Sequence, residues 1–509
     1  MVATTYARVI STELMIDWDF DDTYTDETAY LVRASGQMRF HPPGTGIWSG
    51  SGIVDRCVIE LDNSTGRYSP LNSGGALYAD IAAGGAYHAP MYLRVSINGG
   101  SNYYRIFTGV IKIPRETGST TKNTATVTID CRSNEEAILS KRISTTEATF
   151  AWRFNNERNE SEAIYAMLID AGIVVGDMDL DDGTFVIPWA WLDKESPVEG
   201  CWRAASSSGG RFYCSPDGKF TFDNAWAWLV NSNSTSSQAT LTTSDFQRLQ
   251  PYYNDTELYE NVTVTAYPLD IVAQDTIWES DVVYTVPAGK TVVVEAELDN
   301  PAYVVDTATY AANTSGGQDI SGNVTLTQTN YAQRVKLSFA NANATQAALV
   351  QTIVITGRSV EGAGEVVQNE TSAIAAAVTF WGDREGRDRQ LSMNRWIQTQ
   401  AQIKYLAGFL ADRHSLPRLF WKVSGAQGDP ERRLGDLITL TDASMSVSSR
   451  GAFITAIDWQ YQPSGPFTQN YEAIDAADLY PYIDAAIGYF VIGTNTLGAG
   501  SATPGRVFY

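Results

Sequence analysis

Apolar and polar residues alternate along most of this chain, which is the pattern of strands with one buried face. Near the start, Ile16, Trp18 and Phe20 alternate with aspartates. Comparable runs predict further strands at residues 54–61, 91–97, 103–113 and 125–131. Turn sequences such as Asn98-Gly-Gly-Ser101 separate these runs. We therefore predict an antiparallel barrel or sandwich over residues 1–145, closed by a short helix at 134–142.

Helical periodicity appears after residue 145. Asn159 stands three residues before Glu162, as in an N-terminal cap, and Gly172 supplies a stop. Between them, apolar residues repeat at helical spacing: Ile164, Met167, Leu168 and Ala171. Further helices are predicted at residues 198–206 and 394–414. Between those two helices, Pro216-Asp-Gly218 predicts the turn of a β-hairpin.

A stretch rich in Thr and Val at residues 258–358 returns to strand periodicity and predicts a small inserted all-β domain. Strands that close the surrounding mixed segment are expected at 418–423, 436–441 and 453–462. The tail after Pro463 has few charges and many Ala, Gly and aromatic residues, so we expect a partner surface to cover it. The fold class is mainly β with α+β portions. The predicted domains are 1–145, 146–265, 266–360, 361–465 and 466–509.

The chain is long and acidic. Its 509 residues exceed what one core supports, and 44% of them are hydrophobic. The 58 acidic and 36 basic residues give a net charge of -22, which argues against a role in gripping nucleic acids. No signal-peptide pattern and no membrane-spanning apolar run is present, so we expect a soluble protein made in the cytosol. The four cysteines form no CxxC pair and are predicted to be free buried thiols: Cys57, Cys131, Cys201 and Cys214.

Six carboxylates fall within thirteen residues near the start of the chain. A calcium loop of the EF-hand type would take ligands from Asp17, Asp19 and Asp21. Such a loop also needs a glycine and a bidentate glutamate at two positions where this chain has Asp22 and Thr28. We therefore predict a strand that ends in an Asp-rich turn, and the sequence leaves open whether this turn binds calcium.

Paired carboxylates are also the catalytic groups of glycosidases, which hold them ~5 to 9.5 Å apart. Asp181 with Asp182, or Asp19 with Glu27, could serve that chemistry. Tryptophan suits sugar stacking, but four tryptophans occupy core-facing positions of their patterns: Trp18, Trp202, Trp396 and Trp459. With 58 acidic residues, chance supplies many such pairs. We predict that the protein is not an enzyme.

Metal and nucleophile chemistry has little support. The histidines are far apart in the sequence, no GxSxG or HExxH motif accompanies them, and loop or surface positions are expected for all three: His41, His88 and His414. The glycine loop at residues 44–52 lacks the third glycine and the strand-to-helix setting of a nucleotide cradle. We predict no catalytic, cofactor-binding or metal-binding residues.

Six segments occur in a characteristic order: "DWDFDDTYTDET" at 17–28, "RIFTGVIKIP" at 105–114, "GGRFYCSPDGKFTF" at 209–222, "LYENVTVTAYP" at 258–268, "RRLGDLITLTD" at 432–442 and "YFVIGTNTLGAG" at 489–500. Together they resemble the tail-hub or baseplate-hub proteins of long-tailed bacteriophages. The resemblance covers most of the chain and is weakest in the inserted domain. In the fifth segment, a Gly-Asp turn leads into a strand whose residues Leu437 and Leu440, with Ile438 between them, are expected to enter a barrel.

The resemblance implies a structural role in a virion. In such hubs, two tail-tube-like antiparallel β-barrels per subunit let a homotrimer present a pseudo-sixfold ring to the tail tube. The implied partners are further copies of the chain, tail-tube and distal tail proteins, and tail-tip or fibre proteins met through the C-terminal arm. The tape-measure protein and DNA would pass through the lumen without specific binding, which the acidic charge favours. The implied location is the tail tip, after assembly in the host cytoplasm.

Two other functions stay open. A tail-associated glycan or peptidoglycan hydrolase would use the carboxylates and tryptophans described above. A carbohydrate-binding tip protein would use the inserted domain, which we predict to be a β-sandwich. The leading prediction is a tail hub built from tube-like β-barrels and this inserted sandwich, with no cofactor.

Overall fold

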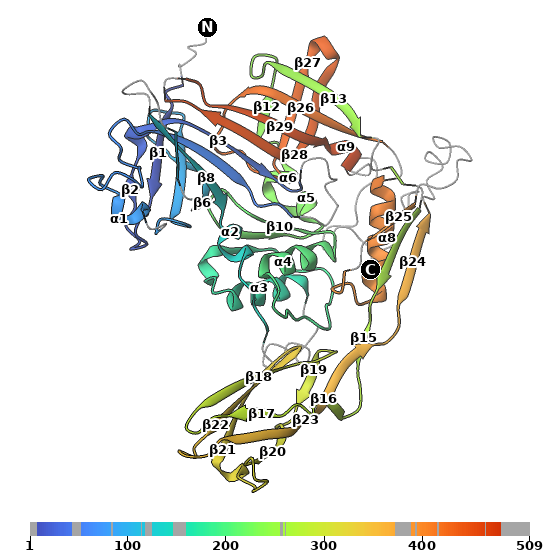
Figure 1. Ribbon diagram of the computed structural model, residues 1–509. Coiled ribbons are helices and arrows are strands. Elements are labelled where there is room, and N and C mark those ends of the chain that lie inside the picture. Colours follow the sequence, from blue (N-terminus) through green and yellow to red (C-terminus); the bar gives the residue numbers. More distant parts are fainter. Residues whose placement is uncertain are drawn as a thin grey trace.

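The computed structural model contains one large sheet, a small α+β unit beside it and a separate β domain (Figure 1). The described residues are 8–42, 52–82, 85–112, 114–117, 125–145, 159–254, 258–259, 261–371, 388–391, 394–414, 417–463 and 465–479. Most elements among them are strands, so the predicted mainly β class with α+β portions is confirmed. Among these residues, no helix combines the length and the apolar character needed to span a bilayer.

The main sheet has 14 strands and unites two distant parts of the chain. The N-terminal part supplies β1 (Ser11–Ile16), β2 (Thr25–Asp26), β3 (Leu31–Arg39), β4 (Arg56–Asp62), β5 (Pro90–Ser96), β6 (Tyr104–Ile111), β7 (Arg115–Thr117) and β8 (Thr126–Ser133). Later segments supply β12 (Ala239–Leu241), β13 (Arg248–Asn254), β26 (Arg418–Gln427), β27 (Leu437–Asp442), β28 (Val447–Tyr461) and β29 (Thr468–Asp475). The main path runs β13-β26-β29-β28-β3-β4-β8-β6-β5-β1-β2, and no pairing between described strands closes it into a barrel.

The two parts of the sheet meet where β3 pairs with β28. Gly36 lies directly opposite Trp459, and a Cβ atom at Gly36 would overlap the indole ring. One hydrophobic core continues beneath both parts and includes Ile59 from the N-terminal strands and Ile457 from the C-terminal strands. Strands from the segments predicted as separate domains therefore share one sheet and one core.

The predicted C-terminal arm needs a correction at its start. Residues 468–475 form β29, which lies between β26 and β28 inside the main sheet, and the short helix α9 (Ala476–Leu479) follows. Five of the eight residues of β29 are buried and it pairs with a strand on each side, so it is an inner strand of the sheet. The rest of the predicted arm, from residue 480 on, lies outside the described residues.

A small α+β unit packs beside the main sheet. Its elements are α2 (Glu135–Leu139), α3 (Glu160–Asp170), β9 (Met178–Leu180), α4 (Pro197–Ser206), β10 (Arg211–Cys214) and β11 (Phe220–Asp223). The predicted cap of α3 is confirmed, because the Asn159 side chain accepts the Glu162 N–H at 3.2 Å. At the other end, the Ile173 N–H donates to the Leu168 carbonyl in a Schellman motif around Gly172. The predicted β10–β11 hairpin is also present.

The inserted domain is a β-sandwich, as predicted, and lies at the far end of the molecule from the main sheet (Figure 1). One sheet is organised on the long strand β23 (Ala348–Gly362), which pairs with β15 (Leu269–Ile271), β16 (Asp275–Ser280), β17 (Tyr284–Val286), β19 (Ala302–Val305) and β20 (Thr309–Asn313). The other sheet contains β18 (Thr291–Glu297), β22 (Arg334–Asn341) and β21 (Val324–Tyr331). Phe339 and Ile353 belong to the core that the two sheets enclose.

A three-stranded sheet and one long helix connect the sandwich to the rest. The sheet consists of β24 (Val366–Thr371), β14 (Asn261–Ala266) and β25 (Asp388–Gln390), and α8 (Gln400–His414) packs on it. The helix was predicted from residue 394, which is six residues too early. Thr399 and Gln402 form a reciprocal capping box, in which each side chain accepts the backbone N–H of the other residue. The apolar Trp396 suggested an earlier start, but it is buried in the α+β unit.

The remaining described elements are single turns. They are α1 (Tyr78–Ile81), α5 (Ala227–Val230), α6 (Ser232–Thr235), η1 (Thr28–Tyr30), η3 (Val175–Asp177), η4 (Ser321–Asn323) and η5 (Ala443–Met445).

We expect the change Gly109→Ala to destabilise the main sheet. Gly109 in β6 lies opposite Ser133 in β8, and a Cβ atom there would overlap the backbone carbonyl of Arg132. Because backbone cannot yield without disturbing the strand pairing, the expected loss is about 1–3 kcal/mol of unfolding free energy. Urea denaturation measures it. Gly408→Ala in α8 is the control, since nothing lies near its Cβ position and it should stabilise the helix slightly.

Candidate functional site

The acidic segment near the N-terminus forms a rigid turn that presents an aromatic side chain. Strand β1 ends at Ile16, earlier than the predicted alternation through Phe20. The buried Asp17 carboxylate accepts the backbone N–H groups of Asp21 at 3.2 Å and Asp22 at 3.1 Å. Phe20 and Asp22 have positive φ angles of 62° and 65°, so the chain leaves the strand direction here. As a result, Phe20 is 50% exposed instead of facing the core.

Three carboxylates of this turn approach one another. Oxygen atoms of Asp17, Asp19 and Asp21 lie within 4.8 Å of one another, at the spacing expected for the first three ligands of a calcium loop. The pKa of Asp19 is raised by lost hydration and by the charge of Asp21. However, both Asp17 oxygens already accept backbone N–H groups, and the Thr28 hydroxyl accepts the Leu14 N–H. The geometry accounts for a turn without an ion.

The last acidic residue of the segment, Glu27, is the centre of a buried polar cluster. Its side chain is fully buried. Its two carboxylate oxygens accept four hydrogen bonds, from Trp18 Nε1 at 3.0 Å, Arg67 Nη2 at 2.7 Å, Arg67 Nε at 3.1 Å and the Tyr68 hydroxyl at 2.6 Å. This cluster fixes the turn, β2 and the loop after β4 against one another. Glu27 therefore has a structural role. Its carboxylate is fully engaged in hydrogen bonds, so it is not available to form the postulated catalytic pair with Asp19.

The second postulated pair, Asp181 and Asp182, also has a structural explanation. The Asp181 carboxylate accepts the Asn224 N–H at 3.2 Å, and the Asp182 carbonyl accepts the Asn224 side-chain amide at 3.0 Å. Burial raises the pKa of Asp181, and the charges of Asp179 and Asp182 act in the same direction. In turn, burial and the charge of Asp181 raise the pKa of Asp223 on β11, a neighbour that sequence spacing could not reveal. Asp223 accepts the Tyr213 hydroxyl at 3.1 Å.

We expect Asp223 to make stability depend on pH. Burial raises its pKa to about 6, against the influence of Arg211 and with smaller effects from Asp181, Tyr213 and Asp179. A raised pKa means that the folded state favours the protonated carboxyl. The protonated Asp223 carboxyl therefore contributes to the stability of the fold at a pH below the unfolded pKa near 4. This contribution is lost as the pH rises through about 6.

The Asp223→Asn variant should therefore be more stable than the wild type at pH 8 by an amount of the order of 2 kcal/mol, and the advantage should vanish at pH 4. Thermal denaturation between pH 4 and pH 8 measures the difference between the two proteins. The exposed Asp217→Asn variant is the control. Equal curves for wild type and Asp223→Asn would contradict the prediction.

The remaining sequence candidates do not assemble into a site. Two histidines are partly exposed, His41 in its loop and His88 stacked on Tyr87, whereas His414 is buried at the end of α8 beside Tyr259. The expectation of a loop or surface position is therefore wrong for His414. Of the glycine loop, Gly52 is the residue that lies within the described part. Three of the four tryptophans are core residues as predicted and the fourth is partly buried: Trp18, Trp396, Trp459 and Trp202. The four cysteines are buried free thiols.

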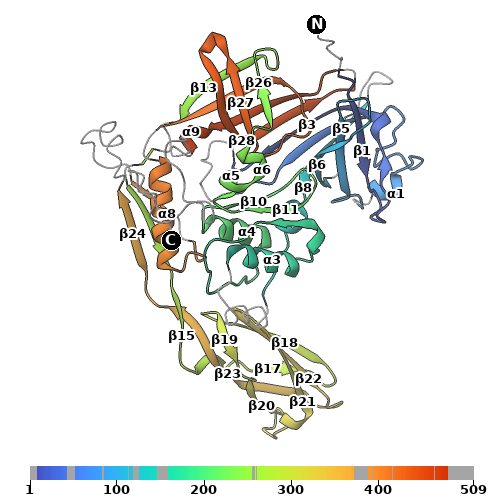
Figure 2. The same cartoon turned by 180° about the vertical axis from the view of Figure 1, so that it is seen from behind.

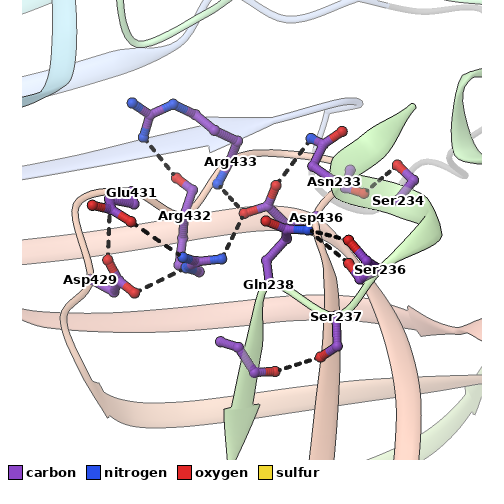
Figure 3. A network of polar contacts seen from close by, with 12 residues as sticks. Asn233, Ser234, Ser236, Ser237, Gln238, Asp429, Glu431, Arg432, Arg433 and Asp436 are labelled. Atoms are coloured by element: carbon purple, nitrogen blue, oxygen red, sulfur yellow. Dashed lines mark hydrogen bonds and ion pairs between the residues drawn. The ribbon is translucent and has the colours of Figure 1, made fainter.

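The Gly-Asp corner, residues 432–436, connects three parts of the molecule (Figure 3). Gly435 has a φ angle of 84°, and the buried Asp436 accepts hydrogen bonds from Arg432 at 3.2 Å and the Arg433 N–H at 2.9 Å. Asn233 donates to the other oxygen of Asp436 at 3.1 Å, and Ser234 donates to the Gly435 carbonyl at 2.9 Å. Figure 3 shows Asp436 between these donors.

The strand after the corner enters the core with a register that differs from the prediction. Ile438 and Leu440 are fully buried, whereas Leu437 is half-buried. Because side chains of a strand alternate between its two faces, Ile438 and Leu440 share the buried face, and Leu437 lies on the other face. On the other side of the corner, Arg433 reaches the carbonyl of Arg105 in β6 at 3.4 Å.

No protein-family model and no curated protein matches the sequence. Among solved structures, the chain is similar to the tail protein from Neisseria meningitidis MC58, with 9% identity, 93% of this chain and 98% of that chain covered, and a TM-score of 0.49. It is also similar to the 43 kDa tail protein of prophage MuSo2 from Shewanella oneidensis, with 9% identity, coverage of 92% and 99%, and a TM-score of 0.46. For prophage tail protein gp18 from Listeria monocytogenes EGD-e, the identity is 7%, the coverage 91% and 94%, and the TM-score 0.41.

Proposed function

We propose that this protein is a non-enzymatic structural component of a bacteriophage tail, and that it forms a homotrimeric hub between the tail tube and the tail tip. One observation carries the proposal: the main sheet joins two β units side by side through β3 and β28, so each subunit offers two such units to a ring. Three subunits would then contribute six units, which suits a sixfold tube.

The charge and the acidic groups support a structural role over an enzymatic one. A net charge of -22 suits the wall of a channel through which the tape-measure protein and DNA pass, because like charges keep DNA from adhering. The carboxylates that could have served a glycosidase hold the fold together, through Glu27 and Asp181. Tail-associated hydrolase activity therefore has less support than the hub.

The division of labour within the subunit is part of the proposal. The unit at 1–145 and the main-sheet strands β12, β13 and β26 to β29 would form the ring, the rest of the segment 146–265 would brace it, and the sandwich at 266–360 would extend outward. The chain after residue 479 would contact tail-tip or fibre proteins. Partners in the ring direction would be tail-tube and distal tail proteins.

Labelling of virions tests the proposal directly. Antibodies against the purified protein, carrying gold particles, should mark the tail tip in electron micrographs, and the purified protein should sediment as a trimer. Gold confined to host membranes, or absent from purified particles, would end the proposal. A zymogram on peptidoglycan should remain without clearing; a cleared zone would favour the hydrolase instead.

A further inference from the structure

The main sheet has two ends, and they lie on opposite sides of the molecule. One end consists of β1 and β2, and the other of β13 and β26. Figures 1 and 2 show β1 on the opposite flank from β13 and β26 in both views. Among the described strands, none pairs with the outer edge of β13 or of β2. A free sheet edge exposes groups that can contact another chain.

The β1–β2 end is acidic and carries an apolar projection. No Lys or Arg occurs from residue 9 to residue 32, and this stretch holds seven carboxylates. Asp19, Asp21 and Asp22 are exposed around Phe20, and Tyr24 lies nearby against Tyr92. Because the Asp17 carboxylate fixes the turn, Phe20 is held outside the core before any partner arrives. An exposed, preorganised aromatic residue is typical of an interface anchor.

The β13–β26 end has the opposite character. These two strands contain Arg248, Arg418 and Lys422 and no acidic residue. Arg418 is directed to the carbonyl of Arg413. Arg248 is exposed, and Lys422 is about half exposed, although its ammonium group also lies 3.8 Å from Glu472.

The strand register places Lys422 between Arg248 and a pair of aromatic rings. Gln250 lies opposite Lys422 and Tyr252 opposite Phe420, so alternate residues of β13 share one face with these partners. The Tyr252 and Phe420 rings stack with centroids 5.5 Å apart, and the Lys422 ammonium lies 5.0 Å from the Tyr252 centroid. Pro251 interrupts the outer edge of β13, which disfavours regular strand addition and favours contact through side chains.

We propose that the acidic end of one copy binds the basic end of a second copy, head to tail. Phe20 would pack against Tyr252 and Phe420, while Asp21 and Asp22 would face Arg248 and Lys422. This inference rests on the proposed hub and names its subunit contact. A second copy is the fitting occupant because one chain carries both complementary surfaces, while its net charge of -22 repels another copy elsewhere. A head-to-tail contact repeated around a closed ring leaves no end uncovered.

Two variants test the contact, and each carries substitutions at one end of the main sheet only. The acid-end variant combines Phe20→Asn, Asp21→Asn and Asp22→Asn; asparagine tolerates the left-handed backbone and keeps the turn. The basic-end variant combines Arg248→Gln and Lys422→Gln. Sedimentation velocity of the full chain at 0.1 M NaCl should show trimers for the wild type and monomers for each variant alone, with the dissociation constant raised at least tenfold.

The mixture of the two variants gives the decisive result. Each variant keeps one intact end, so an equimolar mixture should form a one-to-one dimer that grows no further. Leu71→Ser, which alters an 89% exposed apolar residue outside both ends, is the control and should leave the trimer unchanged. Circular dichroism melting checks that the variants fold.

Other outcomes would overturn the inference. It fails if the wild type is monomeric, if both variants still form trimers, or if the mixture stays monomeric. Failure of the contact is distinguishable from failure of the hub proposal. Trimers that persist in both variants refute this contact and leave the hub standing, whereas the gold-labelling experiment tests the tail position independently of any variant.

Discussion

Replacing Glu27 by alanine is expected to lower the free energy of unfolding of the main sheet by about 3–5 kcal/mol. The side chain is fully buried and accepts bonds from Trp18, Arg67 and Tyr68. Its removal would leave the partly buried Arg67 guanidinium and the buried Tyr68 hydroxyl without their acceptor, which costs more than the bonds themselves contribute. The loss should appear as a lower urea midpoint in tryptophan fluorescence.

Two matched variants show whether the cause is the buried charge. Asp26→Asn changes the neighbouring exposed carboxylate and should alter stability by less than about 0.5 kcal/mol. Glu27→Gln retains the volume and one acceptor, so its effect should lie between those of Asp26→Asn and Glu27→Ala. A loss below about 1 kcal/mol for Glu27→Ala would show that water or neighbouring groups replace the carboxylate. In that event the turn that presents Phe20 would not depend on this cluster.

Local patterns in the sequence predicted the elements whose signals are local. The cap at Asn159, the stop at Gly172 and the Asp-Gly hairpin at 216–218 all involve residues within a few positions of one another. The capping box at Thr399 was equally visible in the sequence, but the apolar Trp396 suggested an earlier helix start. Periodicity alone could not separate a helical residue from one buried in another unit.

The joining of the two β units could not be predicted in this way. Gly36 pairs with Trp459 across more than four hundred residues, and a period of two specifies which face of a strand is buried but not its neighbour. The same reason explains the errors at the candidate site. Glu27 looked like one acid among six, because its donors Arg67 and Tyr68 come from a loop forty residues away. The interaction of Asp223 with Asp181 could not be predicted from the sequence, because it depends on the pairing of β9 with β11.

The Gly-Asp corner should be the second most sensitive point of the described structure. We expect Asp436→Ala to cost about 3–5 kcal/mol of unfolding free energy. The Arg432 side chain is 8% exposed and the Asp436 side chain 4% exposed, so the change would leave a buried guanidinium without its deepest partner. Burial raises the pKa of Asp436, while its hydrogen bonds to the Arg433 N–H and Asn233 act in the opposite direction.

A comparison within the same network gives the test. Asp429 also pairs with Arg432, at 3.1 Å, but its side chain is 26% exposed, so Asp429→Asn should cost less than about 1 kcal/mol. Hydrogen exchange should show faster exchange in β12 and β27 for Asp436→Ala, because Asn233 and Ser234 tie the segment before β12 to this corner. If exchange increased equally in both variants, the corner would act through Arg432 alone. Unchanged exchange in Asp436→Ala would mean that the pairing of β12 with β27 suffices to hold the two segments together.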